Sequence, residues 1–238
     1  MNKDIIFRDL GTTDYQEAWG LQTALFDRIV AQKLRNREQG TDDPTTNYLL
    51  FTEHRPVYTL GRNGDAGHLL VRESELEKAG VSLFRTNRGG DITFHGPGQI
   101  VGYPLLDLDN FTPDIHLYVR LLEETVIRTL YDFGIEASRL EGKSGVWIDP
   151  FAPTARKICA VGVRTSRWTT MHGFALNVNA DLEYFRHIVP CGISDKGVTS
   201  IAAEKREAIP MGSVKERLLI HFADVFSCRI VPDSSHVL

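Results

Sequence analysis

The sequence is poor in cysteine and has no long hydrophobic run. Its 3 cysteines, at positions 159, 191 and 228, are odd in number and lack C-x-x-C spacing, which fits reduced thiols and argues against a zinc site or a disulfide framework. No window approaches the roughly 18 apolar residues of a membrane-spanning helix. The N-terminal residues MNKDIIFRD show neither a secretory signal nor a transit peptide. These absences predict a cytoplasmic protein.

The sequence also lacks an excess of positive charge. Its 27 Lys and Arg residues against 31 Asp and Glu residues give a net charge of −4, which argues against a protein that binds nucleic acid through bulk charge. Hydrophobic residues make up 42% of the 238 positions and charged residues 24%, as in an ordinary globular protein. No repeat or low-complexity tract divides the chain, and we expect a single domain over residues 1–238.

Capping signals and apolar periodicity predict three helices, over residues 13–37, 112–133 and 213–226. Short runs of strand-forming residues lie between them: Tyr48–Phe51, Val57–Leu60, Val81–Arg85, Asp91–Phe94, Ile100–Leu105, Gly145–Ile148, Lys157–Val163 and Gly173–Val178. Their irregular alternation with helices predicts an α+β or mixed α/β fold around one central sheet. The absence of a regular βαβ repeat argues against Rossmann and TIM-barrel folds.

The most unusual composition is the segment Arg88–Gln99, RGGDITFHGPGQ, in which four glycines and a proline surround a short strand. Glycine allows backbone N–H groups to approach a ligand closely and tolerates a positive φ. The pattern fits either a segment against which a thin substrate lies or a tight hairpin with a glycine bulge. Gly61, Gly64 and Gly67 likewise fit a ligand loop or an ordinary turn, and they match no phosphate-binding motif.

Lys157 begins an otherwise apolar run, KICAVGV. If the run is a regular strand, alternate residues share one face, namely Lys157, Cys159, Val161 and Val163. Burial of the ammonium group would lower its pKa and make the neutral amine accessible. The alternative is an ordinary solvated lysine at a strand end.

Cys191 lies between Pro190 and Gly192, a pattern that predicts a turn. A cysteine on a turn is more accessible than one in a strand, although free cysteines are commonly buried structural residues. Thiol chemistry requires a nearby base or cation. Lys157, His95 and His172 are the candidates, and each histidine alone also fits a hydrogen-bonded structural role.

Taken together, these segments resemble the octanoyltransferases, or lipoyl(octanoyl) transferases, of lipoate-protein biosynthesis. The matching segments follow one another along the chain as Arg55–Gly61, Arg88–Gln99, Arg156–Ile158, Ala160–Arg164, His172–Asn179 and Pro190–Ile193. The resemblance implies a fold shared with biotin and lipoate protein ligases and a single catalytic acyltransferase domain.

The resemblance also implies the reaction: transfer of an octanoyl group from octanoyl-acyl carrier protein to a lysine of a lipoyl domain. The expected acceptors are the lipoyl domains of 2-oxoacid dehydrogenases and the glycine cleavage H-protein. Cys191 takes the position of the catalytic cysteine, Lys157 that of the catalytic lysine, and His172 is a possible supporting residue. The implied substrate-binding residues are Arg88, Gly89, Gly90, Asp91, Ile92, Thr93, Phe94, His95, Ala160, Val161, Gly162, Gly173, Phe174 and Ala175.

Thioester chemistry makes cofactors unnecessary, because a thiolate exchanges one thioester for another and preserves the activation of the acyl group. We therefore expect no requirement for ATP. The cysteine spacing predicts no metal, the net charge predicts no nucleic-acid partner, and the lack of a long apolar run predicts no membrane partner. Acyl carrier proteins are acidic, which makes arginines candidates for a docking patch. The arginines considered are Arg62, Arg88, Arg164 and Arg167.

Three other functions remain open at this point. An ATP-dependent lipoate or biotin ligase would keep the lysine but would not need a covalent cysteine. A cysteine hydrolase would use Cys191 with His95 or His172, although the sequence has no recognised nucleophile signature for that class. A non-catalytic binder of lipoyl domains would leave every thiol and lysine unmodified.

Overall fold

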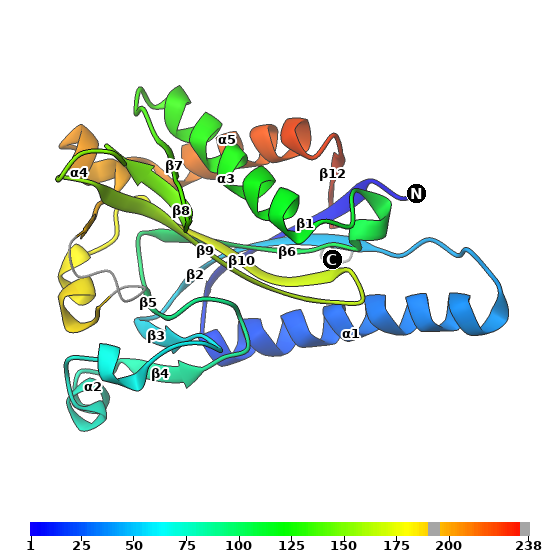
Figure 1. Cartoon of the computed structure of the whole chain (residues 1–238), viewed down its shortest axis with the longest axis horizontal. Coiled ribbons are helices and arrows are strands. Elements are labelled where there is room, and N and C mark those ends of the chain that lie inside the picture. Colours follow the sequence, from blue (N-terminus) through cyan, green and yellow to red (C-terminus); the bar gives the residue numbers. More distant parts are fainter. Residues whose placement is uncertain (190–195, 234–238) are drawn as a thin grey trace.

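A mixed sheet of nine strands forms the centre of the computed structural model, which describes residues 1–189 and 196–233 (Figure 1). The strand order is β12-β1-β2-β6-β10-β9-β8-β7, and β11 pairs with β9 outside that path. The strands are β1 (Asp4–Thr13), β2 (Asn47–His54), β6 (Gln99–Leu105), β7 (Ser138–Leu140), β8 (Lys143–Ile148), β9 (Arg156–Ser166), β10 (Thr169–Asn177), β11 (Gly197–Val198) and β12 (Arg229–Pro232). The pairs β1–β12, β1–β2 and β9–β11 are parallel, and the other pairs are antiparallel.

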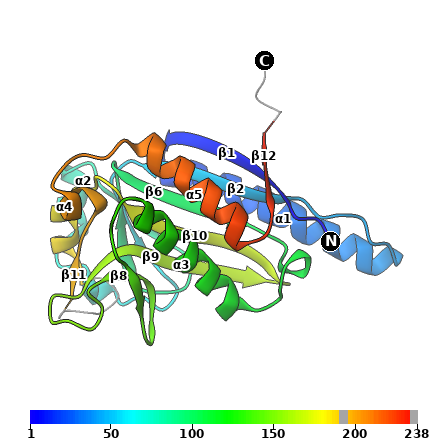
Figure 2. The ribbon, with the colours of Figure 1, turned by 90° about the horizontal axis from the view of Figure 1, so that it is seen from above.

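Helices cover both faces of this sheet (Figures 1 and 2). The long helix α1 (Tyr15–Gln39) packs on one face, where Phe26 and Ile29 join an apolar cluster with Val101 and Ala175 of the sheet. On the other face, α3 (Ile115–Asp132) and α5 (Met211–Val225) bury a larger cluster that includes Leu122. The short helix α4 (Ile201–Lys205) follows β11.

A smaller sheet lies near the N-terminal end of α1 (Figure 1). Its order is β4 (Ser82–Arg85), β3 (Val57–Leu60) and β5 (Ile92–His95), and it packs with α2 (Glu73–Lys78). Tyr58, Leu76 and Phe94 form its apolar core. The side of β5 opposite this core faces the large sheet, so residues of both sheets surround the space between them.

The predicted mixed α/β architecture with a central sheet flanked by helices is confirmed. The predicted starts of the helices are less accurate. Thr13 does not cap α1, because it ends β1 and its hydroxyl contacts that of Thr52 at 2.7 Å. Asp114, rather than Thr112, caps α3 by accepting from the backbone amides of His116 and Leu117. Helix α5 begins at Met211, so Ser213 lies inside its first turn.

No helix in the described part of the chain is both long enough and apolar enough to cross a lipid bilayer.

Candidate active site

A cavity lies between the two sheets, where β9 and β10 face the segment that leads into β5. Its lining combines small residues with buried polar side chains: Tyr15, Arg88, Gly90, Asp91, Ile92, Thr93, His95, Val101, Tyr103, Ser144, Lys157, Ala160, Val161, Gly162, His172, Gly173, Phe174 and Ala175. Every residue predicted to bind substrate, apart from Gly89 and Phe94, lines this cavity, as do Lys157 and His172. The structure thus brings together segments that lie far apart in the sequence, and their roles in binding remain predictions.

Gly89 and Phe94 face elsewhere for identifiable reasons. The Gly89 amide donates to the carbonyl oxygen of Val163 at 2.9 Å, which holds the glycine-rich segment against β9. The ring of Phe94 lies on the opposite side of β5, stacked on Tyr184 with 4.3 Å between ring centroids. Phe94 therefore supports the small sheet.

Lys157 faces the cavity because β9 contains an irregularity. Trp147 of β8 pairs with Lys157, whereas the preceding Val146 pairs with Cys159, so Ile158 is an extra residue in the ladder. A bulge of this kind shifts the alternation of side chains by one residue. Lys157 consequently lines the same cavity as Ala160, while Ile158 and Cys159 pack in the core. The prediction that Lys157 and Cys159 share a face of a regular strand is wrong.

The Lys157 side chain is buried and packs against an aromatic ring. It is only 8% exposed, and its Nζ lies 4.7 Å from the centre of the Trp147 ring. The neighbouring Cys159 thiol is fully buried, and desolvation raises its pKa well above the usual range, so Cys159 is a structural residue rather than a nucleophile.

The Arg88 guanidinium holds the glycine-rich segment in place. It donates to the carbonyl oxygens of Gly89 and Asp91 and to the carbonyl and hydroxyl oxygens of Thr59 on β3. Arg88 is 8% exposed. Its expected part in a surface docking patch is therefore wrong, and it links β3 to the wall of the cavity instead.

Three histidines, His54, His95 and His172, are buried around this end of the cavity. Desolvation lowers the pKa of His54 to about 4 and the pKa values of His95 and His172 to about 3, and the Arg88 cation adds to the effect at the latter two. All three rings are therefore neutral at pH 7. They offer hydrogen-bonding atoms without charge, which suits a cavity for an apolar group.

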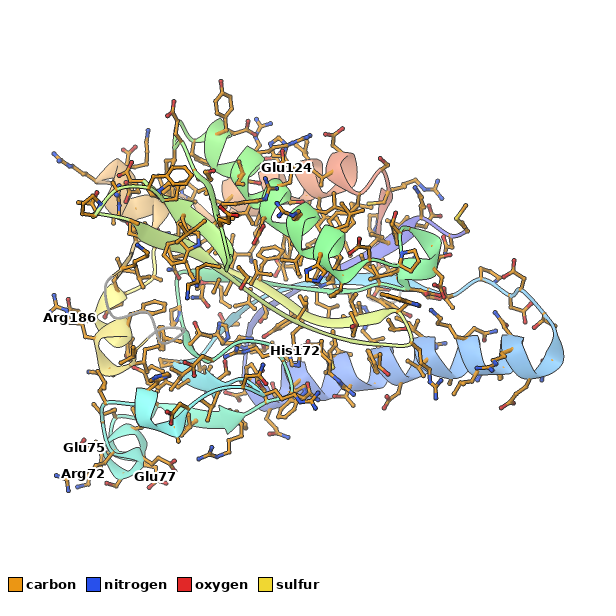
Figure 3. The ribbon with its side chains drawn as sticks, in the orientation of Figure 1. Arg72, Glu75, Glu77, Glu124, His172 and Arg186 are labelled. Atoms are coloured by element: carbon orange, nitrogen blue, oxygen red, sulfur yellow. The ribbon has the colours of Figure 1, made fainter. Side chains whose placement is uncertain are left out.

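His172 also has an unusual backbone and an unpaired ring atom. Its φ is 62°, which is uncommon for a residue other than glycine. Its Nε2 contacts the side-chain oxygen of Asn87 at 2.7 Å, and its buried Nδ1 has no hydrogen-bond partner among the described residues. Figure 3 shows His172 inside the molecule, whereas Arg186 and Glu75 project from its edge.

Two described segments on either side of residues 190–195 are tied to the cavity. The Asp91 carboxylate accepts from the ring of His68, and the His68 carbonyl accepts from the Val189 amide at 2.8 Å. On the other side, Val198 of β11 pairs in parallel with Lys157. Cys191 itself lies outside the described residues.

Sequence reasoning missed four residues of the cavity, Tyr15, Val101, Tyr103 and Ser144. Val101 and Tyr103 alternate along β6, and Val101 pairs with Ala175. Their spacing on a predicted strand was a usable signal, since alternate residues share one face. Tyr15 and Ser144 reach the cavity only through tertiary packing.

No group of three or more His, Cys, Asp or Glu side chains within residues 1–189 and 196–233 is arranged to hold a metal ion.

Comparisons with known proteins identify the family of the chain. The family model of the lipoyl protein ligase A/B catalytic domain matches residues 14–223. The octanoyltransferase of Christiangramia forsetii is 55% identical over 231 residues, which cover 97% of this chain and 99% of the relative. The octanoyltransferase of Flavobacterium johnsoniae is 55% identical over 232 residues, covering 97% of this chain and 100% of the relative.

Among solved structures, the fold is similar to that of a bipartite lipoate protein ligase, described with its E2 lipoyl domain, from Thermoplasma acidophilum. The TM-score is 0.70 at 15% identity, over 99% of this chain and 89% of the other. The chain therefore belongs to the lipoyl protein ligase A/B catalytic domain family and, by its close similarity to octanoyltransferases over nearly its whole length, is an acyltransferase enzyme of that group.

Proposed function

We propose that the protein transfers an octanoyl group from octanoyl-acyl carrier protein to the ε-amine of a lysine on a lipoyl domain. In this proposal Cys191 carries the acyl group as a thioester and Lys157 acts as general acid and base. The observation that supports it most is the position of Lys157, a buried amine in the wall of a cavity lined largely by small and apolar residues.

The first half-reaction exchanges one thioester for another. Lys157, as the neutral amine, takes the proton from the Cys191 thiol, and the thiolate attacks the octanoyl carbonyl carbon. The tetrahedral intermediate collapses with cleavage of the bond to the carrier sulfur. The carrier thiolate then receives the proton from Lys157, so that charge and protons balance.

The second half-reaction forms the amide. The acceptor lysine has an unperturbed pKa of about 10.4 and arrives as ammonium, so it must lose a proton before its amine attacks the Cys191 thioester. Neutral Lys157 accepts that proton and passes it to solvent. The amine then attacks the thioester carbonyl carbon, the bond to the Cys191 sulfur breaks, and the remaining proton of the attacking nitrogen passes through Lys157 to the Cys191 thiolate. The products are the amide, the Cys191 thiol and one proton released to solvent. No bond is made to a nucleotide or a metal in either half, and we propose that neither is required.

The described residues on either side of residues 190–195 support a Cys191–Lys157 pair. The Val189 amide donates to the carbonyl oxygen of His68, and the His68 ring donates to Asp91 in the cavity wall. After residue 195, Val198 of β11 pairs with Lys157. Both of these described segments therefore lie close to the cavity wall.

The small residues of the cavity suit an unbranched acyl chain. Ala175 pairs with Val101 on one side and Ala160 on the other, and Gly173 pairs with Gly162. Apart from Val101, these residues carry no side chain larger than a methyl group, which leaves space against the sheet. The neutral histidines at the Arg88 end avoid placing a titrating charge beside an apolar ligand.

A transfer assay without nucleotide separates this proposal from its rivals. Purified protein, octanoyl-acyl carrier protein and a lipoyl domain should yield the octanoyl-lysine amide in the absence of ATP. Strict ATP dependence would indicate a ligase, and release of free octanoate without amide would indicate a hydrolase. Binding of the lipoyl domain without any modification would indicate a non-catalytic binder.

A further inference from the structure

A line of buried side-chain amides connects the cavity wall to the turn beside Lys157. Gln99 at the start of β6 and Asn177 at the end of β10 are 1% and 4% exposed. Gln99 Nε2 donates to Asn177 Oδ1 at 2.8 Å, and Asn177 Nδ2 donates to the carbonyl oxygen of Thr199 at 3.0 Å. The Thr199 backbone amide in turn donates to the carbonyl oxygen of Lys157 at 3.0 Å.

Two backbone carbonyls fix the orientation of both amides. Because a carbonyl oxygen only accepts, the Asn177 group facing Thr199 must be its NH₂ group. The Gln99 group facing the Phe94 carbonyl, at 3.2 Å, is an NH₂ group for the same reason. The Gln99 oxygen is then left to face His95, whose Nδ1 lies 2.7 Å away.

This orientation decides the tautomer of His95. The Gln99 oxygen can only accept, so Nδ1 of His95 carries the proton and Nε2 is an acceptor. Nε2 lies 3.4 Å from the Thr59 hydroxyl, which itself accepts from Arg88. One continuous set of hydrogen bonds thus runs from Arg88 through His95, Gln99 and Asn177 to Thr199.

The far end of this set is anchored by an ion pair. The Thr199 hydroxyl donates to the Glu204 carboxylate at 2.6 Å, and Arg156 binds the same carboxylate through Nε and Nη2, each at 2.6 Å. Arg156 immediately precedes Lys157. Thr199, whose amide donates to the Lys157 carbonyl, is therefore held by Asn177 through its own carbonyl and by Glu204 through its hydroxyl.

Gln99 and Asn177 also border the space next to the lysine. They line a smaller pocket together with Lys157, and that pocket shares Thr93, Ala160 and Ala175 with the main cavity. Their polar atoms are already engaged within the protein. A role in holding Lys157 and His95 in place explains these two buried amides better than contact with an apolar substrate.

We propose that Gln99 and Asn177 are positioning residues for the transfer reaction, which fix the backbone of Lys157 and the tautomer of His95 relative to the cavity. This inference rests on the proposed function of Lys157. A displacement of about 1 Å at a reacting group can lower a rate a hundredfold. We call the hydrogen bonds from His95 through Gln99 and Asn177 to Thr199 the relay. Loss of the relay should therefore reduce turnover more than substrate affinity.

The test compares two asparagines of the same chain segment. Asn177→Leu removes both relay bonds, and Asn177→Asp keeps the shape but replaces the donor to Thr199 with an acceptor. Asn179 is the matched control, since its side chain also makes two hydrogen bonds, here both with the backbone of Ile209: it accepts from the amide at 2.9 Å and donates to the carbonyl at 2.8 Å. Asn179 does not line the cavity. Octanoyl transfer and thermal unfolding are measured for both Asn177 variants, Asn179→Leu and Lys157→Met.

We expect both Asn177 variants to lower kcat by about tenfold or more, with KM for carrier protein and lipoyl domain within about twofold of the wild-type values. Asn179→Leu should lose comparable thermal stability but keep kcat within about twofold. The inference is overturned if Asn177→Leu keeps wild-type kcat, or if Asn179→Leu loses kcat to the same extent. An inactive Lys157→Met with a normal Asn177→Leu would reject the relay alone, whereas a fully active Lys157→Met would reject the proposed function and the relay with it.

Discussion

Gly89 donates its backbone amide to the carbonyl oxygen of Val163 at 2.9 Å, so the glycine-rich segment lies directly on β9. The contact is possible only because the adjacent strand residue is Gly162. A Cβ atom at Gly162 would lie 2.9 Å from the carbonyl oxygen of Gly89, closer than normal packing allows. The two glycines together set the distance between the cavity wall and the sheet.

Gly162→Ala should therefore displace the glycine-rich segment and impair acyl loading. We expect the rate of octanoyl transfer to the enzyme to fall by about tenfold. Gly20→Ala provides the control, because an added Cβ there contacts nothing within 4 Å and alanine favours a helix by about 1 kcal/mol over glycine. Normal loading by Gly162→Ala would show that the segment does not shape the acyl site.

Ala160→Leu should shorten the space for the acyl chain. Ala160 lines both the main cavity and the smaller pocket beside Lys157, so a larger side chain there occupies volume between them. We expect transfer from octanoyl carrier protein to fall more than transfer from butanoyl carrier protein, while Ala160→Ser leaves the ratio unchanged. An unaltered preference for octanoyl over butanoyl in Ala160→Leu would place the acyl chain elsewhere.

Asp91→Asn should weaken the attachment of Val189 to the cavity. The carboxylate of Asp91 accepts from the ring of His68 and from the Asp65 amide, the latter at 3.1 Å, and a hydrogen bond to a charged group contributes about 1.5–3 kcal/mol. The variant should lose stability in this range and form the acyl-enzyme more slowly. Asp65→Asn is the control, since the Asp65 side chain caps only its own turn at Gly67. Equal acylation rates in Asp91→Asn and the wild type would exclude this positioning role.

The buried histidines predict a pH dependence of stability. Desolvation lowers the pKa of His54 to about 4 and those of His95 and His172 to about 3, from the ordinary histidine value of 6.5. Below pH 6.5 the unfolded chain therefore binds protons that the folded protein does not. Protonation of the unfolded chain therefore lowers the free energy of unfolding below pH 6.5, whereas above pH 6.5 the full stability is present. The loss grows as the pH falls toward the folded-state pKa values and reaches about 2 kcal/mol per histidine at pH 5.

Urea unfolding at pH 7.5 and pH 5 measures this loss. His54→Gln removes one of the three titrating groups and should reduce the difference in unfolding free energy between the two pH values. An unfolding free energy that stays constant from pH 7.5 to pH 5 would contradict the burial of these rings as neutral groups.

The sequence was a better guide to the elements and motifs than to their exact geometry. Local patterns located α1, α3 and α5 and the strands that line the cavity, because apolar residues recur in those segments with the period of a helix or a strand. Strands β1 and β12, at one end of the sheet, were missed, since β12 is only four residues long and β1 is largely polar or half-buried. Their formation depends on parallel partners distant in the chain.

For the candidate site, too, the sequence identified key residues but not their local geometry. The glycine-rich segment and Lys157 were identified from composition and family resemblance, and the structure brings them to one cavity. The bulge at Ile158 was not predictable from KICAVGV, because an extra residue in a ladder depends on the neighbouring strand β8. The amides of Gln99 and Asn177 gave no signal either, since their roles follow from contacts between residues 78 positions apart.

The most direct test of the account is the mass of the intact protein after incubation with octanoyl-acyl carrier protein, followed by peptide mapping of the modified residue. The account predicts one octanoyl group on Cys191, removed when a lipoyl domain is added, and no adduct in Cys191→Ser. Lys157→Met should form this adduct far more slowly. An octanoyl group on Cys159 or Cys228, or undiminished transfer by Cys191→Ser, would contradict it.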